Sequence, residues 1–237
     1  MSHRSQTFVL LHGAWHGGWC WERVASILRD RGHRVTAPTQ TGLGERAHLM
    51  SPDIDLEVFT DDLVNHLIWE DLDQVVLVGH SFGGNAISGA AARVPDRIQR
   101  LVYFDALVPI NGRAPFEDFP PGVVAERTRQ AEESSGGLSI PPPPAAAFGV
   151  TQTDDAVWID SRMTPHPLRT FTSSLSLGPD PANGLPAEYV LCVDPLYGNV
   201  EGSLNRARDL GWPLTEIATG HDAMVTAPDR LSDVFDQ

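Results

Sequence analysis

Ser81 is the residue of this chain best placed to do chemistry, because it stands at the centre of Gly79-His80-Ser81-Phe82-Gly83. Glycine two residues to either side lets a serine sit at a sharp turn between a strand and a helix, where a larger side chain would collide with neighbouring backbone. The apolar residues 75–78 and the small residues 85–92 predict that strand and that helix. Amides at the start of the helix, Phe82's among them, would face negative charge that develops beside the serine. The segment predicts a nucleophile for attack on a carbonyl, with the Phe82 amide as one oxyanion donor.

His221 is the residue that we expect to activate Ser81. A serine hydroxyl is a weak nucleophile until a base takes its proton, and neutral imidazole suits that role near physiological pH. His221 follows Gly220 and an expected strand near the end of the chain, where a loop can return over the serine. Of the other histidines, His80 is expected to point away from the nucleophile and His12 to order a neighbouring loop. Ser81 and His221 are therefore the predicted nucleophile and general base.

The composition excludes several classes of protein. Seventeen basic and 31 acidic residues give a net charge of -14, which argues against nucleic acid or an anionic membrane surface as partner. Cys20 and Cys192 are too few for a disulfide scaffold and lack metal-ligand spacing, so we expect buried free thiols and neither a metal nor another cofactor. Polar residues 1–4 lead into an apolar run without a signal-peptide pattern, and no apolar run approaches the roughly 18 residues that span a bilayer. A cytoplasmic location is expected.

Alternating apolar runs and helical repeats indicate how these residues are positioned. The strand–helix alternation implies an α/β fold with a mostly parallel, doubly wound sheet covered on both faces. The expected strands are residues 8–11, 34–37, 75–78, 98–104, 189–193 and 214–217. The helices are marked by Trp21, Val24, Ala25 and Leu28, by Leu56, Phe59, Leu63 and Leu67, by Leu204, Ala207 and Leu210, and by Pro228 as the opening residue of the last one.

Residues 107–186 interrupt this alternation with proline, glycine and polar residues. The segment carries too many aromatic residues and leucines to be a disordered linker, so we expect short helices around 123–133 and 154–163, joined by loops. The sequence therefore predicts an α/β core made of residues 1–106 and 187–237, with residues 107–186 as a helical cap insertion.

Several of these segments resemble the α/β-hydrolase superfamily, and within it the small esterases that include plant methylesterases and hydroxynitrile lyases. The stretch from Phe8 to Trp21 is similar to the N-terminal signature of that group, Thr41-Gly42-Leu43-Gly44 to its second loop, and Gly220-His221-Asp222-Ala223-Met224 to its histidine loop. The likeness covers most of the chain apart from the insertion. It implies an α/β-hydrolase fold and, just past His12-Gly13, the Ala14 amide as the second oxyanion donor.

Two aspartates compete for the third position of a catalytic triad, the carboxylate that orients His221. Members of the esterase group usually place an aspartate a few residues beyond the strand expected at 189–193, but Asp194 comes early and directly precedes a proline, which restricts its backbone. Asp105 ends an apolar strand, in a context that resembles haloalkane dehalogenases and some lipases. A carboxylate buried there requires a compensating partner. Asp105 is the favoured acid, and Asp194 remains the alternative.

Two tryptophans are the predicted substrate contacts. Trp15 stands one residue beyond the proposed donor Ala14, and Trp158 lies in the insertion. Together with phenylalanines of the insertion, Trp158 would form an apolar wall above the site. This wall favours a small, largely apolar ester as substrate.

The predicted function is hydrolysis of such an ester, or of a related carbamate, amide or lactone, by a serine carboxylesterase through an acyl-serine intermediate. One alternative is a lyase that resembles the hydroxynitrile lyases. Those enzymes carry threonine where this chain has Gly13 and lysine after the histidine, whereas Asp222 here opposes the cation that cyanide requires. The other alternative is a noncatalytic relative that binds small molecules. The expected partners are the ester substrate and, as an open question, a second copy of the chain in a homodimer.

Overall fold

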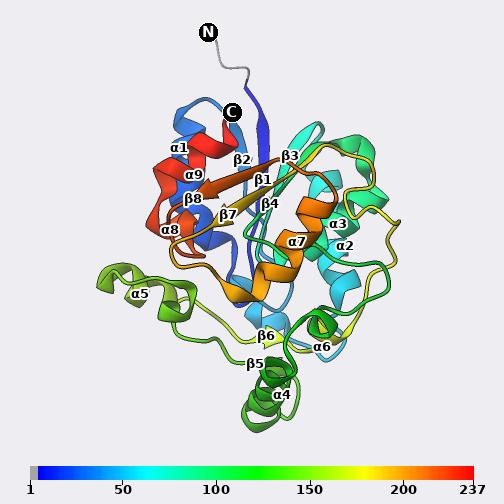
Figure 1. Cartoon of the computed structure of the whole chain (residues 1–237), viewed down its shortest axis with the longest axis vertical. Coiled ribbons are helices and arrows are strands. Elements are labelled where there is room, and N and C mark those ends of the chain that lie inside the picture. Colours follow the sequence, from blue (N-terminus) through cyan, green and yellow to red (C-terminus); the bar gives the residue numbers. More distant parts are fainter. Residues whose placement is uncertain (1–4) are drawn as a thin grey trace.

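A computed structural model describes residues 5–237 and has a six-stranded parallel sheet at its centre (Figure 1). The strands are β1 (Thr7–Leu11), β2 (Arg34–Thr36), β3 (Val75–His80), β4 (Ile98–Phe104), β7 (Ala187–Cys192) and β8 (Leu214–Ile217). Their spatial order is β2-β1-β3-β4-β7-β8, and every neighbouring pair is parallel. The carboxyl ends of all six strands therefore meet at one edge of the sheet, and the predicted α/β fold is confirmed.

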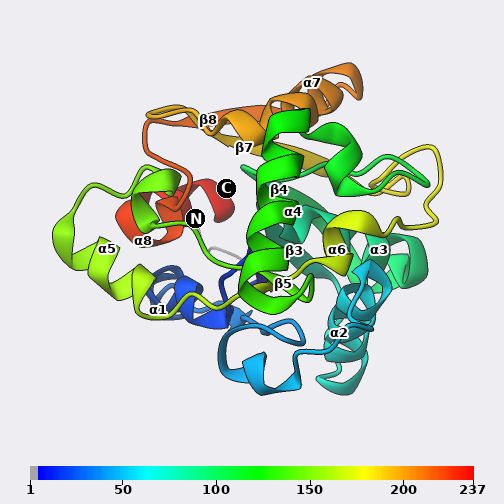
Figure 2. The same cartoon turned by 90° about the horizontal axis from the view of Figure 1, so that it is seen from below.

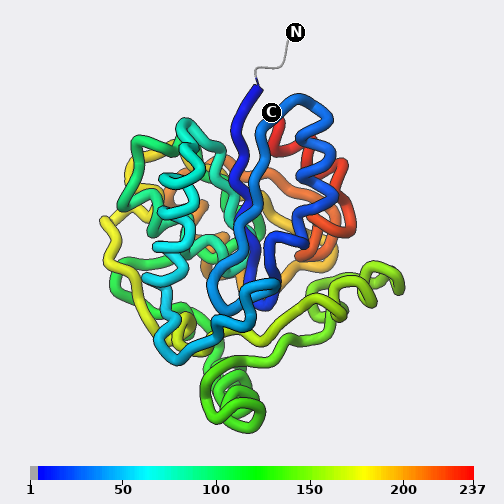
Figure 3. Tube along the Cα trace, turned by 180° about the vertical axis from the view of Figure 1, so that it is seen from behind, coloured from blue at the N-terminus to red at the C-terminus, as the bar shows by residue number. Residues whose placement is uncertain are grey.

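Helices cover both faces of this sheet, which explains why its strands are nearly continuous apolar runs. All six residues of β3 are buried. One face is covered by α1 (Glu22–Asp30), α8 (Ala223–Thr226) and α9 (Pro228–Phe235), and the other by α2 (Leu56–Trp69), α3 (Gly83–Arg93) and α7 (Glu201–Asp209) (Figures 1 and 3). In α1 the residues at helical spacing, Val24, Ala25 and Leu28, are the buried ones, as the periodicity predicts.

Helix α3 packs unusually close to its neighbours because small residues line it. A Cβ on Gly84 would lie 1.9 Å from the Leu107 carbonyl oxygen, and a Cβ on Gly89 would lie 2.3 Å from Thr60 Oγ1. A larger residue at Gly84 would clash with the segment that follows β4, and a larger residue at Gly89 would clash with α2. The helix that follows Ser81 is thereby held directly against the carboxyl edge of the strands.

The segment between β4 and β7 lies across that carboxyl edge, as Figures 1 and 2 show. It contains α4 (Pro121–Ser135), α5 (Thr153–Asp160) and α6 (Arg169–Thr172), together with the antiparallel pair β5 (Ser139–Ile140) and β6 (His166–Pro167). Helices α4 and α5 correspond to the two that the sequence predicts, although α5 ends before residue 163. The division of the chain into a core and a cap with boundaries at 107 and 186 stays a prediction.

The structure differs from the sequence-based expectations in several further details, since β7 ends at Cys192 and Trp21 precedes α1. Strand β2 ends at Thr36, and Leu210 lies just beyond α7 with 40% of its side chain exposed, so it is not part of the buried helix face. Cys20 and Cys192 are free and buried, as predicted. Residues 1–4, on which the absence of a signal sequence is predicted, lie outside the described residues. Within residues 5–237, every helix is too short or too polar to cross a lipid bilayer.

Candidate active site

Ser81 follows β3 directly, where the chain turns into α3. Its φ is +52°, a left-handed conformation that residues with a Cβ seldom adopt. The Ser81 amide donates to the Phe104 carbonyl oxygen at 3.1 Å, and its carbonyl oxygen accepts from the Leu107 amide at 2.8 Å. A Cβ on Gly83 would lie 2.7 Å from the His12 carbonyl oxygen, so glycine is required there. The strained turn that the sequence predicts is present and is held by neighbouring backbone.

His221 and Asp105 form a buried hydrogen-bonded pair. His221 Nδ1 donates to Asp105 Oδ2 at 2.5 Å, and the exposed fractions of the two residues are 1% and 0%. The second carboxylate oxygen, Oδ1, accepts from the Cys192 amide at 3.1 Å. Because a carboxylate only accepts, Nδ1 carries a proton, and in the neutral tautomer the lone pair therefore lies on Nε2. This buried Nε2 has no hydrogen-bond partner among the described residues.

The two candidate acids are placed very differently. Asp105 follows β4 with a φ of +42°, and its amide donates to the Val190 carbonyl oxygen at 2.7 Å. This places its carboxylate on His221. Asp194 is exposed, and its amide donates to the Thr219 carbonyl oxygen. The structure therefore brings Asp105, and not Asp194, to the histidine.

His80 ties the histidine loop to the turn that carries Ser81. His80 Nε2 donates to the His221 carbonyl oxygen at 3.1 Å, and the two ring centroids are 4.5 Å apart. Burial lowers the pKa of His80 well below its ordinary value, so the ring is neutral. His221 is thereby held beside the residue that immediately precedes Ser81.

The loop after β1 carries the second predicted oxyanion donor. His12 Nδ1 donates to the Gly13 carbonyl oxygen at 2.8 Å, and His12 Nε2 accepts from the Gln40 amide at 3.1 Å. Burial lowers the pKa of His12 to about 3, so this neutral ring orders the loop. A Cβ on Gly13 would lie 2.8 Å from Ser81 Cβ, which places the loop against the serine. Within residues 5–237, neither the Ala14 amide nor the Phe82 amide donates a hydrogen bond.

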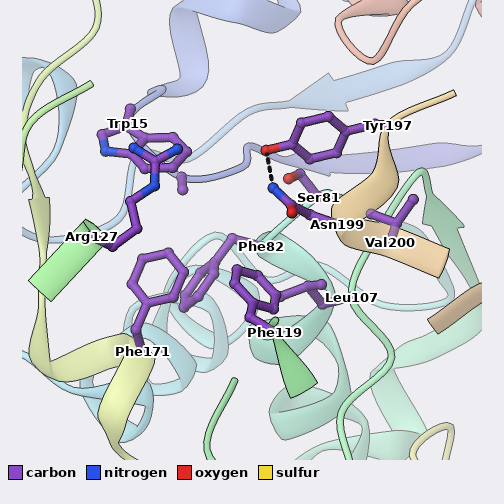
Figure 4. Close-up of a pocket in the computed structure, with 11 residues that line it drawn as sticks. Trp15, Ser81, Phe82, Leu107, Phe119, Arg127, Phe171, Tyr197, Asn199 and Val200 are labelled. Atoms are coloured by element: carbon purple, nitrogen blue, oxygen red, sulfur yellow. Dashed lines mark hydrogen bonds between the residues drawn. The ribbon is translucent and has the colours of Figure 1, made fainter. Parts of the chain in front are cut away.

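A pocket opens above Ser81, and Figure 4 shows the side chains around it. The walls are mostly apolar and aromatic, with a few polar groups among them. The lining residues are Ala14, Trp15, Ser81, Phe82, Leu107, Phe119, Arg127, Phe171, Tyr197, Asn199 and Val200. Both predicted oxyanion donors and the predicted contact Trp15 thus share the pocket with Ser81.

The two tryptophans that the sequence predicts as substrate contacts lie in different parts of the structure. Trp15 lines the pocket, and its Nε1 donates to the Ile140 carbonyl oxygen at 3.0 Å, which links the loop after β1 to β5. Trp158 does not line this pocket. It packs edge-on against Trp19 at 5.0 Å because α5 folds back beside α1, where Arg23 pairs with Asp155. The expectation that Trp158 contacts substrate is corrected by this placement.

The sequence does not identify several of the residues that line the pocket. Arg127 lies on α4, whose inward face cannot be known from the sequence of an exposed, polar helix. Tyr197 and Asn199 follow β7, and the only available signal is that loops at the carboxyl ends of parallel strands tend to line ligand sites. The Tyr197 ring stacks on His221 with centroids 4.0 Å apart. Asn199 Nδ2 donates to the Tyr197 hydroxyl at 2.9 Å.

A second buried histidine–aspartate pair adjoins the first. His16 Nε2 donates to Asp222 Oδ2 at 3.2 Å, and His16 Nδ1 donates to the Ala14 carbonyl oxygen at 2.8 Å. Burial opposes a charge on His16, but the Asp222 carboxylate outweighs it and raises the pKa of His16 above its ordinary value. Since both ring nitrogens face acceptors, His16 is an imidazolium. No group of three or more His, Cys, Asp or Glu side chains within residues 5–237 is arranged to hold a metal ion.

The chain is similar to known α/β-hydrolases over nearly its whole length. A family model described as the alpha/beta hydrolase family matches residues 8–234. A carbendazim-hydrolysing esterase from Nocardioides sp. is 37% identical over 236 residues, which are 95% of this chain and 96% of that protein. Methylesterase 2 of Arabidopsis thaliana is 40% identical over 147 residues, which cover 58% of this chain and 56% of the relative. An extracellular α/β-hydrolase from a Paenibacillus species has a solved structure with a TM-score of 0.86 and 28% identity, covering 97% of both chains.

Proposed function

This chain belongs to the alpha/beta hydrolase family, and from that premise we propose that it is a serine esterase that cleaves a small ester through an acyl-serine intermediate. The observation that carries the proposal is the hydrogen bonding of the two ring nitrogens of His221. Its Nδ1 is bound to Asp105 Oδ2 at 2.5 Å, while its buried Nε2 has no hydrogen-bond partner in the described part of the chain and lies beside the turn that presents Ser81. The 37% identity to an esterase over nearly the whole chain supports the same class of reaction.

In the proposed mechanism, Ser81 Oγ attacks the ester carbonyl while His221 Nε2 takes the hydroxyl proton. The carbonyl oxygen becomes negatively charged and accepts hydrogen bonds from the Ala14 and Phe82 amides. The imidazolium of His221, stabilised by Asp105, then gives its proton to the departing alcohol. Water enters, loses a proton to the same nitrogen, and releases the acid from Ser81 by the reverse sequence.

The structure supports hydrolysis over the lyase alternative. Hydroxynitrile lyases carry threonine at the position of Gly13, but here a Cβ at that position would lie only 2.8 Å from Ser81 Cβ. The residue after His221 is an aspartate that is bound to His16, so the lysine that hydroxynitrile lyases carry at this position is replaced by a carboxylate. Retention of a paired base and a strained serine likewise supports an enzyme over a noncatalytic binding protein.

Replacement of Ser81 by alanine tests this proposal. We expect Ser81→Ala to lower turnover of a short p-nitrophenyl ester by on the order of 10⁴-fold or more, because the acyl acceptor is lost. Circular dichroism of the variant should match the parent protein. A fluorophosphonate probe should label the parent at Ser81, located by mass spectrometry, and leave the variant unlabelled. Undiminished turnover by the folded variant would refute an acyl-serine mechanism.

A further inference from the structure

Arg127 is a charged residue in an otherwise largely apolar pocket. Its side chain reaches from α4 toward Trp15, as Figure 4 shows, and the guanidinium carbon lies 4.7 Å from the centre of the Trp15 ring. The phenylalanines at 82, 119 and 171 line the same pocket. A guanidinium stacked on an aromatic face keeps its N–H groups at the ring edge, where they can reach a ligand.

The guanidinium of Arg127 has few partners of its own. Its one hydrogen bond to another described residue is a long one, 3.5 Å to Gln130 Oε1, and no carboxylate within residues 5–237 forms an ion pair with it. Arg129, two residues further along the same helix, pairs with both Glu126 and Glu133. Burial lowers the pKa of Arg127, yet a guanidinium stays protonated in proteins. Most of its five N–H donors therefore have no acceptor among residues 5–237.

Arg127 also stands at the boundary between two cavities. The space beside Ser81 is narrow, about 20 Å³, which is close to the room that one water molecule needs. An outer groove of about 630 Å³ adjoins it between α4 and residues 141–144. Arg127 and Asn199 line both cavities. A ligand whose small end reaches Ser81 would therefore extend past Arg127 into the outer groove.

A carboxylate is the group that matches this site best. It accepts two parallel hydrogen bonds from a guanidinium, and such charge-assisted pairs are among the strongest in proteins. Glu126 also lines the outer groove, but its carboxylate is bound to Arg129. Arg127 is thus left to offer an anion a positive charge beside apolar surface.

We propose that the substrate is an ester with a small alcohol or acyl group at Ser81 and a carboxylate on its other end, and that Arg127 binds this carboxylate at the boundary of the two cavities. The assignment rests on the esterase function proposed for Ser81. It narrows the substrate class from apolar esters in general to half esters of dicarboxylic acids and similar compounds. Arg127 is then the residue that determines specificity.

Matched substrates test the proposal. The parent protein should cleave the monomethyl ester of a dicarboxylic acid with a higher kcat/KM than the neutral dimethyl ester of the same acid. Arg127→Met should lower kcat/KM for the half ester by roughly 10- to 100-fold and change the value for the diester less than about threefold, since a hydrogen-bonded charge is lost but the stem remains. For the half ester, kcat/KM of Arg127→Lys should lie between the values of the parent protein and Arg127→Met, because lysine keeps the charge but lacks the planar pair of N–H donors. Arg129→Met is the control and should change neither value.

Binding separates this inference from the proposed function. Calorimetry on Ser81→Ala protein, which cannot turn over either ligand, should show tighter binding of the half ester than of the diester. The preference should disappear in the Ser81→Ala, Arg127→Met double variant. Equal binding of both ligands, or equal losses for both substrates in Arg127→Met, would show that Arg127 merely packs on Trp15. Absent turnover by the parent protein together with an Arg127-dependent binding preference would instead refute the esterase function and leave the anion site standing.

Discussion

Two buried histidine–aspartate pairs meet at a single peptide bond, between residues 221 and 222, and they behave differently. In the first pair, His221 Nδ1 donates a hydrogen bond to Asp105, and His221 Nε2 has no hydrogen-bond partner among the described residues. In the second pair, His16 Nε2 donates to Asp222, and His16 Nδ1 donates to the Ala14 carbonyl oxygen. The comparison teaches that a histidine–aspartate pair becomes a base only where the second nitrogen is left free. Where that nitrogen also meets an acceptor, the histidine ring is held as a cation in an ion pair with the aspartate.

The second pair has a structural reason to exist beside the first. The cation of His16 connects the loop after β1, through Ala14, to the loop that carries His221, through Asp222. The Ala14 peptide whose carbonyl oxygen accepts from His16 is adjacent to the amide that we propose as an oxyanion donor. The second pair therefore positions backbone, while the first is proposed to move a proton.

The largest expected effect separates Asp105 from other carboxylates. Asp105→Asn should lower kcat for a short p-nitrophenyl ester by about 10³- to 10⁴-fold, because an amide favours the wrong tautomer of His221. Asp194→Asn is the matched control and should change kcat less than about threefold, since its side chain is exposed and the effect of a surface substitution is small. Steady-state kinetics on the two purified variants would decide. A larger loss in Asp194→Asn would remove the first pair from the mechanism.

A double-mutant cycle measures the second pair. His16→Ala and Asp222→Ala should each lower the free energy of unfolding by about 3–5 kcal/mol, because each leaves a buried group without its partner. The double variant should lose clearly less than the sum of the two single losses, with a coupling of about 1 kcal/mol or more in urea unfolding. Additive losses would mean that the two side chains do not interact. In His16→Ala, kcat should fall far less than in Asp105→Asn.

The pH dependence of stability distinguishes the charged histidine from the neutral ones. Because the folded pKa of His16 is raised, the stability contributed by its pair is fully present below the ordinary histidine value of 6.5 and is lost as pH rises through the folded value. The stability difference between the parent and Asp222→Asn should therefore shrink as pH rises above neutrality. Urea unfolding across this range measures it, and a difference that grows with pH would contradict a charged His16.

A pH effect of the opposite sign comes from His12. Its folded pKa is lowered to about 3, so below 6.5 the unfolded chain binds a proton that the native ring does not. Between those values, His12 should remove about 1.4 kcal/mol of unfolding free energy per pH unit. His80 and His166, whose pKa values burial also lowers, act in the same direction. His12→Gln should flatten this acid limb in urea unfolding, and an unchanged slope would argue that His12 is protonated in the folded protein.

Much of the fold follows from local pattern. Short apolar runs bounded by glycine or proline, separated by residues at helical spacing, predict the parallel strands and their covering helices, since both periodicities arise from backbone geometry within one element. The turn at Ser81 belongs to the same class, because its glycines and flanking small residues are local. The end of α5 and the exposure of Leu210 are not local, since they depend on which neighbours cover a helix end.

What the amino-acid sequence determined by itself is therefore the order of the elements, the strained serine turn and the late histidine. Only the tertiary structure decided that Asp105 faces His221, that Asp222 is paired with His16, that Trp158 packs on Trp19 away from the pocket, and that Arg127 stands over Trp15. The physical reason is distance along the chain. Backbone conformation depends mainly on the nearest few residues. A buried charge or a pocket wall depends on side chains that are a hundred or more residues apart in the sequence and that meet only when the chain folds.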